Sequence, residues 1–303
     1  MGKKAIFIRR NLPDMAFTDT KPYIIRCPHG CRGDLVDTDI LMPEGPLRIC
    51  PACGQMTSQC TEAVYLETSQ YRDETTGTWP SKRDLRRLTR RRLRTLKTVA
   101  RFLKKDNTQL SLLDVGCSNG AFVWIAQQMG IDAQGVEPGE IPARQAQARG
   151  LVVHKGYLEE LDLPEASFDV VTLFEVIEHI KDPMILINAC HRILRPGGVL
   201  VIGTGNTDSW TRRIMRQRWD FFNINLHGGH INFYSTSSVK VLAAKTGFSL
   251  KKVRTSSVNI FEKDEVPALL YLTAKIIAEL LNLPSRIFNK GHQLEAYLVA
   301  NKV

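Results

Sequence analysis

The segment DVGCSNG, residues 114–120, is a glycine-containing turn that links an apolar run to a helical pattern. Residues 110–115 (LSLLDV) predict a short buried strand, and residues 121–129 predict a helix that ends at Gly130. Between them the chain must turn sharply, and glycine lets the backbone approach a ligand where a Cβ atom would clash. The segment therefore predicts a ligand-binding loop at the carboxyl end of a strand.

The alternation of strand and helix continues after this turn. Strands are predicted over residues 132–137, 151–154, 168–174 and 199–204, and helices over residues 141–149 and 183–194. Strands that alternate with helices in this way are typical of βαβ units. We therefore expect the α/β class, with a doubly wound, mostly parallel sheet, for residues 110–303.

The end of the chain adds a helix over residues 235–246 and two strands over residues 248–258 and 294–303. Between these strands lies an apolar helical insertion, residues 266–288, which is interrupted at Pro284. Its polar face carries few basic residues, Lys275 and Arg286. We therefore expect a lid or a packing element, and we favour this over contact with a membrane surface.

An acidic residue ends the strand that follows the turn. Glu137 comes 23 residues after Asp114, at the place where a carboxylate can accept hydrogen bonds from the ribose hydroxyls of an adenosine. The glycine spacing is shorter than in the G-x-G-x-x-G loops of dinucleotide enzymes, and Ser118 occupies the middle position. The pattern favours a nucleoside cofactor that has no pyrophosphate.

Five segments together resemble one family, the class I S-adenosylmethionine-dependent methyltransferases. They are LLDVGCSNG, GVEP, FDVVTLFEVIEHI (168–180), RILRPGGVLVIGTGN (192–206) and HINFYS (230–235), in the order and spacing of that family. The resemblance covers about residues 110–260. It implies a seven-stranded sheet, S-adenosylmethionine as cofactor and methyl transfer as the reaction.

The resemblance also implies which residues bind the cofactor. The loop glycines with Ser118 would wrap the methionine part, Glu137 the ribose and the residues after the third strand the adenine, while Phe174 and Glu175 would line the pocket wall. The serine in place of the middle glycine narrows the conformational freedom of the turn. The implied cofactor-binding residues are Asp114, Gly116, Cys117, Ser118, Gly120, Glu137, Pro138, Tyr157, Leu158, Phe174 and Glu175.

Residues 1–62 are rich in cysteine, proline and glycine and predict a small zinc-ribbon-like module. Two close pairs, Cys27 with Cys31 and Cys50 with Cys53, are spaced as ligands of one structural zinc ion. Gly30 and Gly54 permit the tight turns within the pairs. The first pair is slightly irregular, so His29 could replace one thiolate, and unrelated buried thiols are the alternative. A zinc module occurs in methyltransferases of small metabolites and of ribosomal RNA, so it leaves the acceptor open.

Methyl transfer to oxygen or carbon usually needs a base, and three histidines lie at the carboxyl edge of the predicted sheet: His179, His227 and His230. Each could instead form an ordinary structural hydrogen bond. The spacing Glu175-x-x-Glu178-His179 with a later histidine also resembles the metal site of small-RNA 2′-O-methyltransferases. The same spacing is frequent in enzymes that act on quinone precursors, so a catalytic metal is an open alternative.

The net charge of +10 is concentrated in residues 81–105, within a connecting region that spans residues 63–109. Leucines at helical spacing predict an amphipathic basic helix with one face in the core. Residues 210–222 (WTRRIMRQRWDFF) mix arginine with aromatic residues, and we expect them to contact the substrate, with an amphipathic packing helix as the alternative.

The acceptor predicted first is a small or glycan-linked molecule. An RNA acceptor bound by the basic helix and a non-catalytic zinc-module scaffold are the alternatives.

The composition is that of a globular chain, with 303 residues of which 43% are hydrophobic. The first ten residues hold an apolar run too short for a signal peptide. No window was expected to reach the roughly 18 apolar residues of a membrane span. We therefore expect a soluble, cytoplasmic enzyme without a transmembrane segment.

Overall fold

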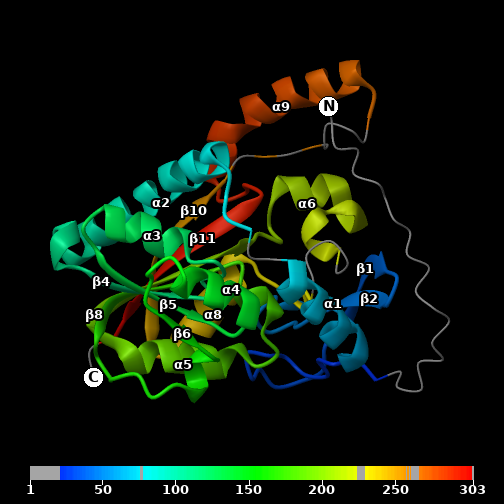
Figure 1. Ribbon diagram of the computed structural model, residues 1–303. Helices are drawn as coiled ribbons and strands as arrows, with labels where there is room; N and C mark the ends of the chain where they lie inside the picture. The colour runs from blue at the N-terminus through cyan, green and yellow to red at the C-terminus, as the bar shows by residue number, and fades with distance from the viewer. Residues whose placement is uncertain are drawn as a thin grey trace.

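The computed structural model describes residues 21–75, 78–223, 229–256, 258, 260 and 266–301, and its centre is a seven-stranded sheet (Figure 1). The strand order is β10-β11-β8-β7-β4-β5-β6. The strands are β4 (Ser111–Val115), β5 (Asp132–Glu137), β6 (Val153–Lys155), β7 (Phe168–Phe174), β8 (Leu194–Gly205), β10 (Phe248–Thr255) and β11 (Gln293–Ala300).

The five strands β4 to β8 run parallel, and β11 is inserted antiparallel between β8 and β10, so that β10 runs in the direction of the other five. The parallel strands are almost wholly buried, which explains their runs of branched apolar residues. Because all five end at the same edge, the loops that follow β4, β5, β7 and β8 meet there. The predicted α/β class with a mostly parallel seven-stranded sheet is confirmed.

Helices cover both faces of the sheet, as a doubly wound fold requires. Apolar side chains of α2 (Lys82–Leu103), α3 (Ala121–Gln128) and α4 (Glu140–Gln147) pack into the core on one face. Those of α5 (Pro183–Ile193) and α8 (Thr236–Lys245) pack on the other. The remaining short helices are η1 (Asn107–Gln109), η2 (Leu158–Glu160), η3 (Ile177–His179), α6 (Trp210–Met215), η4 (Arg216–Arg218) and η5 (Asp220–Phe222).

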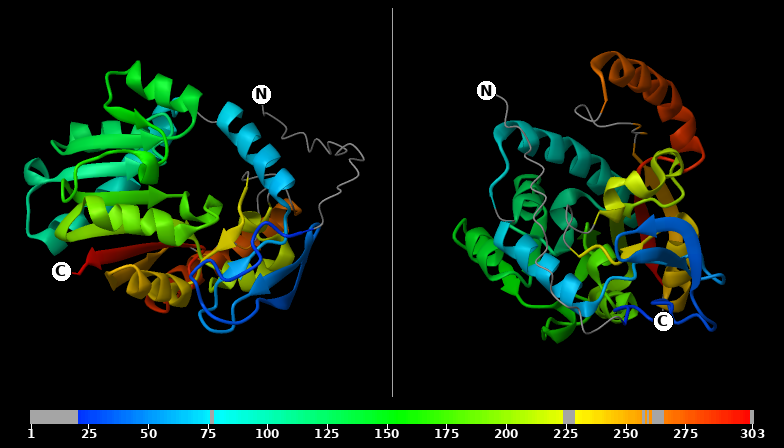
Figure 2. Two further views of the ribbon diagram at one scale, coloured as in Figure 1. Left: turned by 90° about the horizontal axis from the view of Figure 1, so that it is seen from below. Right: turned by 90° about the vertical axis from the view of Figure 1, so that its right-hand side faces the viewer.

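A second, small antiparallel sheet lies near the cysteines, in the order β1-β2-β3-β9. Its strands are β1 (Val36–Met42), β2 (Gly45–Ile49), β3 (Met56–Thr57) and β9 (Asn232–Phe233). The fourth strand comes from the second half of the chain, because Met56 pairs with Phe233 and Thr57 with Asn232. Figure 2 shows the blue strands of this sheet beside the yellow segment that contains β9. The cysteine-rich region is thus joined to the large domain by backbone hydrogen bonds.

Three of the four aromatic residues of the segment 210–222 fill the core of the small sheet. Trp219, Phe221 and Phe222 are buried together with Leu47 and Phe233. The expectation of substrate contact therefore does not hold for the side chains of Trp219 and Phe222, which are enclosed by protein. The arrangement matches the packing alternative, because these side chains supply the core of the small sheet.

Two parts of the chain differ from the expectation. The polar connector after residue 62 begins with a helix, α1 (Glu62–Thr75), whose sequence shows almost no apolar periodicity. The insertion forms α9 (Ala268–Ile287), and this helix is long and apolar enough, by length and composition, to cross a membrane. The prediction that no segment reaches this limit was therefore wrong.

Candidate functional site

The turn after β4 depends on backbone angles that favour glycine. Gly116 has a φ of 71° and Gly120 a φ of 77°, and Ser118 between them takes the same left-handed region with a φ of 49°. A Cβ atom on Gly116 would lie 2.4 Å from Cγ2 of Val176. The loop therefore approaches the end of β7 as closely as its backbone permits, which requires glycine at this position.

Glu137, at the end of β5, lies directly against this turn. Its carboxylate accepts hydrogen bonds from the backbone N–H of Ser118 at 2.7 Å and of Gly139 at 2.9 Å. A carboxylate has about four acceptor positions, so these bonds are compatible with a ribose hydroxyl as a further partner. The structure thus places Glu137 where the sequence predicted it, and adds that it holds the loop in shape.

Asp114 is buried beneath the loop. Its carboxylate accepts a hydrogen bond of 2.6 Å from the hydroxyl of Thr172 on β7, and burial raises its pKa to about 6. Asp114 therefore links β4 to β7 beneath the turn. It supports the loop from below.

The other residues predicted to bind cofactor do not all face the loop. The Cys117 side chain packs against Gly135, where a Cβ atom would lie 2.4 Å from its sulfur. Leu158 lies in the core, so a pocket-lining role is not supported for either side chain. Tyr157 is 52% exposed and Pro138 is half-buried. Tyr157 and Pro138 are therefore accessible to solvent at the carboxyl edge of the sheet.

Sequence reasoning missed one buried residue of this site, Arg92 on α2. Its guanidinium carbon lies 3.1 Å from the centroid of the Phe174 ring and is influenced by the charges of Asp114 and Glu175. Burial lowers the pKa of Arg92 to about 10, so it remains charged at neutral pH. Its Nε and Nη1 atoms have no hydrogen-bond partner among the described residues. A buried cation with unused donors is costly unless a ligand supplies an anion.

A second cluster follows β7, where the structure brings together Glu178, His179 and His230. One potential ligand atom from each of the three lies within 4.8 Å of the others, and all three side chains are buried. The two imidazole rings are 4.7 Å apart, and Nε2 of His230 lies 3.9 Å from a Glu178 oxygen. His227, the third predicted base, lies outside the described residues.

The protonation of His230 follows from its partner. Nδ1 of His230 is 2.9 Å from the carbonyl oxygen of Phe221, and a carbonyl can only accept. The proton of the neutral ring therefore sits on Nδ1, and the lone pair of Nε2 faces the cluster. The carboxyl group of Glu178 is fully buried, with the side chains of Glu175 and Thr204 beside it. Burial and the nearby Glu175 raise the pKa of Glu178 well above its ordinary value.

Glu175 has a different place from the one that the metal alternative predicts. It ends β7 with a φ of 56°, a strained angle for a residue with a Cβ atom. Its carboxylate accepts a hydrogen bond of 3.4 Å from Gln293, and burial raises its pKa. Among the described residues, the group with metal-ligand geometry contains His230 and does not contain Glu175.

The small sheet and α1 hold the loop that carries this cluster. The hydroxyl of Tyr65 on α1 donates to the carbonyl oxygen of His179 at 2.9 Å. Asn232 on β9 donates to the carbonyl oxygen of Ile180 at 2.7 Å, and the N–H of Ile231 donates to that of Glu178 at 2.9 Å. Helix α1 and the segment at β9 together therefore position the carboxyl-edge loop of the large domain.

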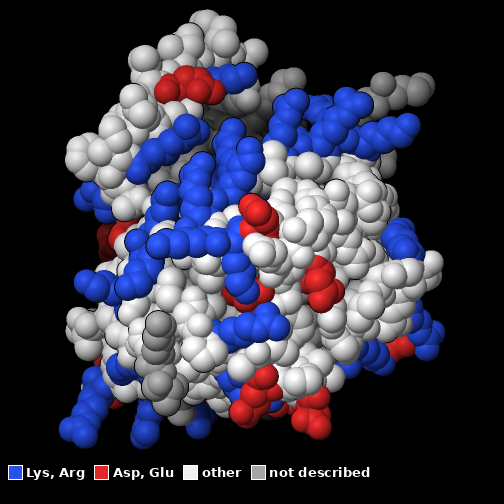
Figure 3. Space-filling model, turned by 90° about the vertical axis from the view of Figure 1, so that its left-hand side faces the viewer, with Lys and Arg blue, Asp and Glu red and all other residues white. Residues whose placement is uncertain are grey.

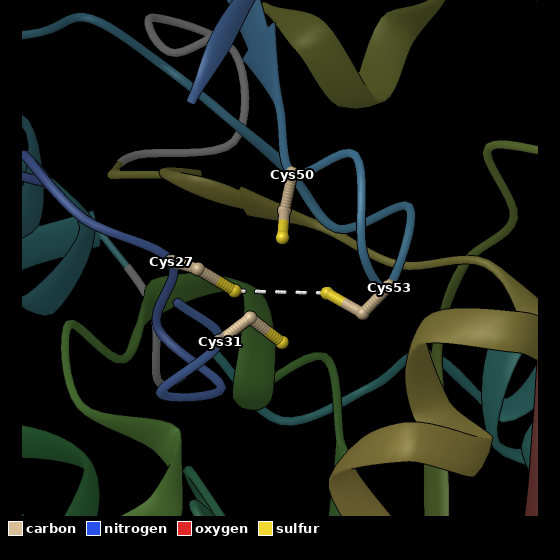
Figure 4. A group of neighbouring side chains, drawn as sticks. All are labelled: Cys27, Cys31, Cys50 and Cys53. Atoms are coloured by element: carbon tan, nitrogen blue, oxygen red, sulfur yellow. Dashed lines mark hydrogen bonds between the residues drawn. The ribbon is translucent and has the colours of Figure 1, made fainter. Parts of the chain in front are cut away.

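The four predicted cysteine ligands meet in space (Figure 4). All four sulfur atoms lie within 4.8 Å of one another, and those of Cys27 and Cys53 are 3.6 Å apart. A tetrahedral zinc–thiolate site has Zn–S bonds of about 2.3 Å and hence sulfur–sulfur edges of about 3.8 Å. Lys245 donates to the sulfur of Cys31 at 3.5 Å, so a cation lies beside the thiols. His29 is not a member of this group of ligand atoms.

The geometry agrees with the comparisons to known proteins. The family description "Methyltransferase domain" matches residues 83–253, more than half of the chain. Among curated proteins, the chain is similar to the ubiquinone biosynthesis O-methyltransferases of Pseudomonas paraeruginosa, with 35% identity over 103 residues, and of Cereibacter sphaeroides, with 35% over 118. These matches cover 32% and 36% of this chain and 44% and 48% of the relatives, so the chain spans about half the length of the curated relatives it matches.

Solved structures show the same fold. A SAM-dependent methyltransferase from Archaeoglobus fulgidus aligns with a TM-score of 0.50 at 18% identity, over 71% of this chain and 94% of that one. The cyclase SpnF aligns with a TM-score of 0.51 at 17% identity, over 79% and 97%. Because the second is a cyclase, this likeness shows the architecture and not the reaction. The family match over residues 83–253, on a sheet of this topology, shows that the chain belongs to the class I S-adenosylmethionine-dependent methyltransferases.

Proposed function

We propose that this enzyme methylates a hydroxyl oxygen of a small-molecule acceptor, with His230 as the base. The observation that carries the proposal is the buried cluster of Glu178, His179 and His230 at the carboxyl edge of the sheet. The curated relatives support an oxygen acceptor, because their names describe O-methyltransferases of ubiquinone biosynthesis.

The residues on the carboxyl edge fit the cofactor that the family uses. The unused donors of buried Arg92 suit the carboxylate of the methionine part. The backbone of the loop from Gly116 to Gly120 is open to close approach, and Glu137 offers acceptors for ribose hydroxyls. The chain therefore offers a cation for the carboxylate of the cofactor, a loop that permits close backbone contact, and a carboxylate for the ribose hydroxyls.

The cofactor supplies an electrophilic methyl group with its own leaving group, so the chain has to align the acceptor and remove its proton. The Nε2 lone pair of His230 can accept that proton, because Nδ1 is occupied by the hydrogen bond to Phe221. The resulting imidazolium would lie 3.9 Å from an oxygen of Glu178, and its positive charge would favour ionisation of that carboxyl group. Burial of the cluster keeps water from competing for these groups.

Exchanging His230 for asparagine tests this role. Asparagine has an N–H donor near the position of Nδ1 and no lone pair at the position of Nε2, so H230N keeps the structural bond and removes the base. We expect kcat with a hydroxyl-bearing acceptor to fall on the order of 100-fold or more. The cofactor Kd, measured by calorimetry, should stay unchanged. A variant with normal kcat and an unchanged pH–rate profile would refute the assignment of His230.

The same cluster favours a second version of this function, in which a divalent cation orients the acceptor hydroxyl. The imidazoles of His179 and His230 and the carboxylate of Glu178 form a suitable ligand set. Chelator treatment should then abolish turnover, and added Mg²⁺, Mn²⁺ or Zn²⁺ should restore it. E178Q should weaken that rescue. If chelator leaves the turnover of the wild type unchanged, His230 acts as a base without a metal.

A comparison of different acceptors tests which class of molecule the enzyme methylates. A panel of phenols, sugars and glycan-linked alcohols should be tested with labelled cofactor at low and high salt, alongside RNA. Turnover of a small acceptor should change little with salt, whereas an RNA acceptor would be lost steeply because its binding releases counterions. Labelled RNA without a labelled small molecule would overturn the small-molecule proposal.

For the four clustered cysteines we propose one structural zinc ion. A set of four thiolates closes the coordination sphere and leaves no position for water or substrate. The nearby Lys245 offsets the negative charge of such a site. Metal analysis of the purified chain tests the proposal, which predicts one zinc per chain that C53A removes.

A further inference from the structure

The helix α9 turns its large apolar side chains away from the protein. Leu269 is 76% exposed, Leu280 74% and Leu283 67%. Their spacing puts them in one outward stripe, because positions three, four and seven apart share a helix face. The stripe consists of Leu269, Leu272, Ile276, Leu280, Leu283 and Ile287, all exposed.

The opposite face of α9 is made of small residues. Ala274, Ala278 and Ser285 are its buried residues and face the protein. The helix thus has the reverse of the pattern of an ordinary surface helix, which buries its leucines and exposes its small and polar residues. A solvent-exposed apolar stripe of this length marks an interaction surface.

A basic groove of about 900 Å³ lies beside α9. It is lined by arginines of α2, by Lys252 and Arg254 of β10 and by Arg286 on the flank of α9, with Asp84 and Glu295 as the acidic members. Figure 3 shows Lys and Arg side chains gathered in one field below the largely uncharged ridge at the top, where α9 lies. Because Arg286 belongs to α9 and also lines the groove, the helix that carries the apolar stripe borders the basic groove.

The attachment of α9 determines how it can meet a membrane. β10 and β11 pair with each other, with Thr255 opposite Leu294, so the insertion leaves and re-enters the sheet at the same place. If α9 crossed a bilayer, residues 256–267 would have to cross as well. That segment carries the sequence Glu-Lys-Asp-Glu at 262–265, and charges in the hydrocarbon layer are costly. A helix attached in this way can lie in the interface plane, with its apolar face among the acyl chains.

We propose that α9 and the basic groove together form a docking surface for an anionic lipid bilayer. The apolar stripe enters the boundary between headgroups and acyl chains, and the arginines of α2 with Lys252 and Arg254 attract the negative headgroups. The occupant is a membrane because it alone satisfies both parts of the surface. RNA would match the groove and leave six apolar side chains in water, and a second copy would bring another field of positive charge to the first.

The surface adjoins the proposed site of methyl transfer. Gln293 lines the groove and donates a hydrogen bond to Glu175 at the end of β7. Arg92 reaches the cofactor site from the same helix whose neighbouring arginines line the groove. Docking would therefore place the carboxyl edge of the large sheet close to the bilayer.

Vesicle sedimentation of the full chain tests the proposal. The probes are phosphatidylcholine vesicles with and without phosphatidylglycerol, and the wild type should bind the anionic vesicles and dissociate at high salt. The double variant L280D/L283D should bind on the order of 100-fold more weakly, because it lacks two exposed leucines that would enter the membrane. The matched control is L66D, which replaces an exposed leucine on α1 and should bind like the wild type.

A charge variant tests the second half of the surface. R87A/R90A/R94A removes three groove arginines, and each should weaken binding to anionic vesicles roughly fivefold. All variants should bind S-adenosylmethionine normally, which separates loss of docking from loss of fold or of the proposed chemistry.

Three results would overturn the proposal. The first is a wild type that ignores anionic vesicles, and the second is an L280D/L283D variant that binds them as the wild type does. The third is a stable dimer in sedimentation velocity that L280D/L283D dissociates while vesicles bind neither form. Binding of RNA without binding of vesicles would assign the groove to nucleic acid instead.

Discussion

Replacing Arg92 with methionine tests how the site receives the anionic end of the cofactor. Methionine keeps most of the apolar length that packs on Phe174 and removes the charge and the donors. In the structure, Nε and Nη1 of Arg92 have no hydrogen-bond partner among the described residues. If the carboxylate of the cofactor uses them, the variant loses at least one hydrogen bond between charged groups.

A hydrogen bond of this kind contributes about 1.5–3 kcal/mol, which corresponds to a rise in Kd of roughly 10- to 150-fold. Isothermal titration with S-adenosylmethionine and with S-adenosylhomocysteine measures it directly. The melting temperature of the ligand-free protein should stay the same or rise, because the variant no longer buries a cation without a hydrogen-bonded anion.

Two controls make the result specific. R86M changes an exposed arginine of the same helix and should leave the Kd unchanged. 5′-Methylthioadenosine lacks the carboxylate, so its affinity should be equal in R92M and in the wild type. If R92M binds S-adenosylmethionine as tightly as the wild type, or loses both ligands equally, Arg92 does not hold the carboxylate.

Further predictions concern the cysteine cluster, the loop support and the buried acid. C53A should lose the bound zinc and melt at a lower temperature, whereas C60A, at a buried cysteine outside the cluster, should keep its metal; equal zinc contents would refute the assignment. Y65F removes the bond to the carbonyl of His179, so we expect about 1 kcal/mol less stability and a lower kcat at unchanged cofactor Kd. Because the folded pKa of Asp114 is raised to about 6, its effect on stability is favourable below pH 4 and is lost as the pH rises to 6. D114N should therefore be the more stable protein at pH 7, by up to about 3 kcal/mol, and urea unfolding between pH 4 and 7 that shows no such divergence would contradict this.

The cofactor loop and the cysteine cluster could be predicted because their signals are local. A glycine turn after an apolar strand, an acidic residue at the end of the next strand and two close cysteine pairs are all visible within short windows. Spacing also identified His179 and His230, but whether they share one cluster with Glu178 depends on the register that joins β9 to β3 and on the contacts of η3.

Arg92 was missed because it lies in a segment where basic residues are frequent, so its charge alone does not distinguish it from the exposed arginines around it. Its position does carry one, since Arg92, Leu96 and Val99 lie at i, i+4 and i+7 on the face of α2 that packs into the core. A basic residue on a core face is the pattern that would have found it. The side chains of Leu158 and Cys117 lie in the core. The position of a residue in a motif does not tell which way its side chain points.

The sequence alone determined the class of fold and the cofactor loop. The apolar periodicity of strands and helices and the glycine turns depend on residues that are close together along the chain. The folded structure alone determined which segments that are distant in the sequence contact one another. The small sheet needs β9 from the second half of the chain, and the loop of Glu178 needs Tyr65 from the first. The basic groove beside α9 draws on α2 and β10, so the few cations on α9 itself gave no indication of it. Electrostatic and polar contacts depend on distance in space, and the packing of the large sheet sets that distance.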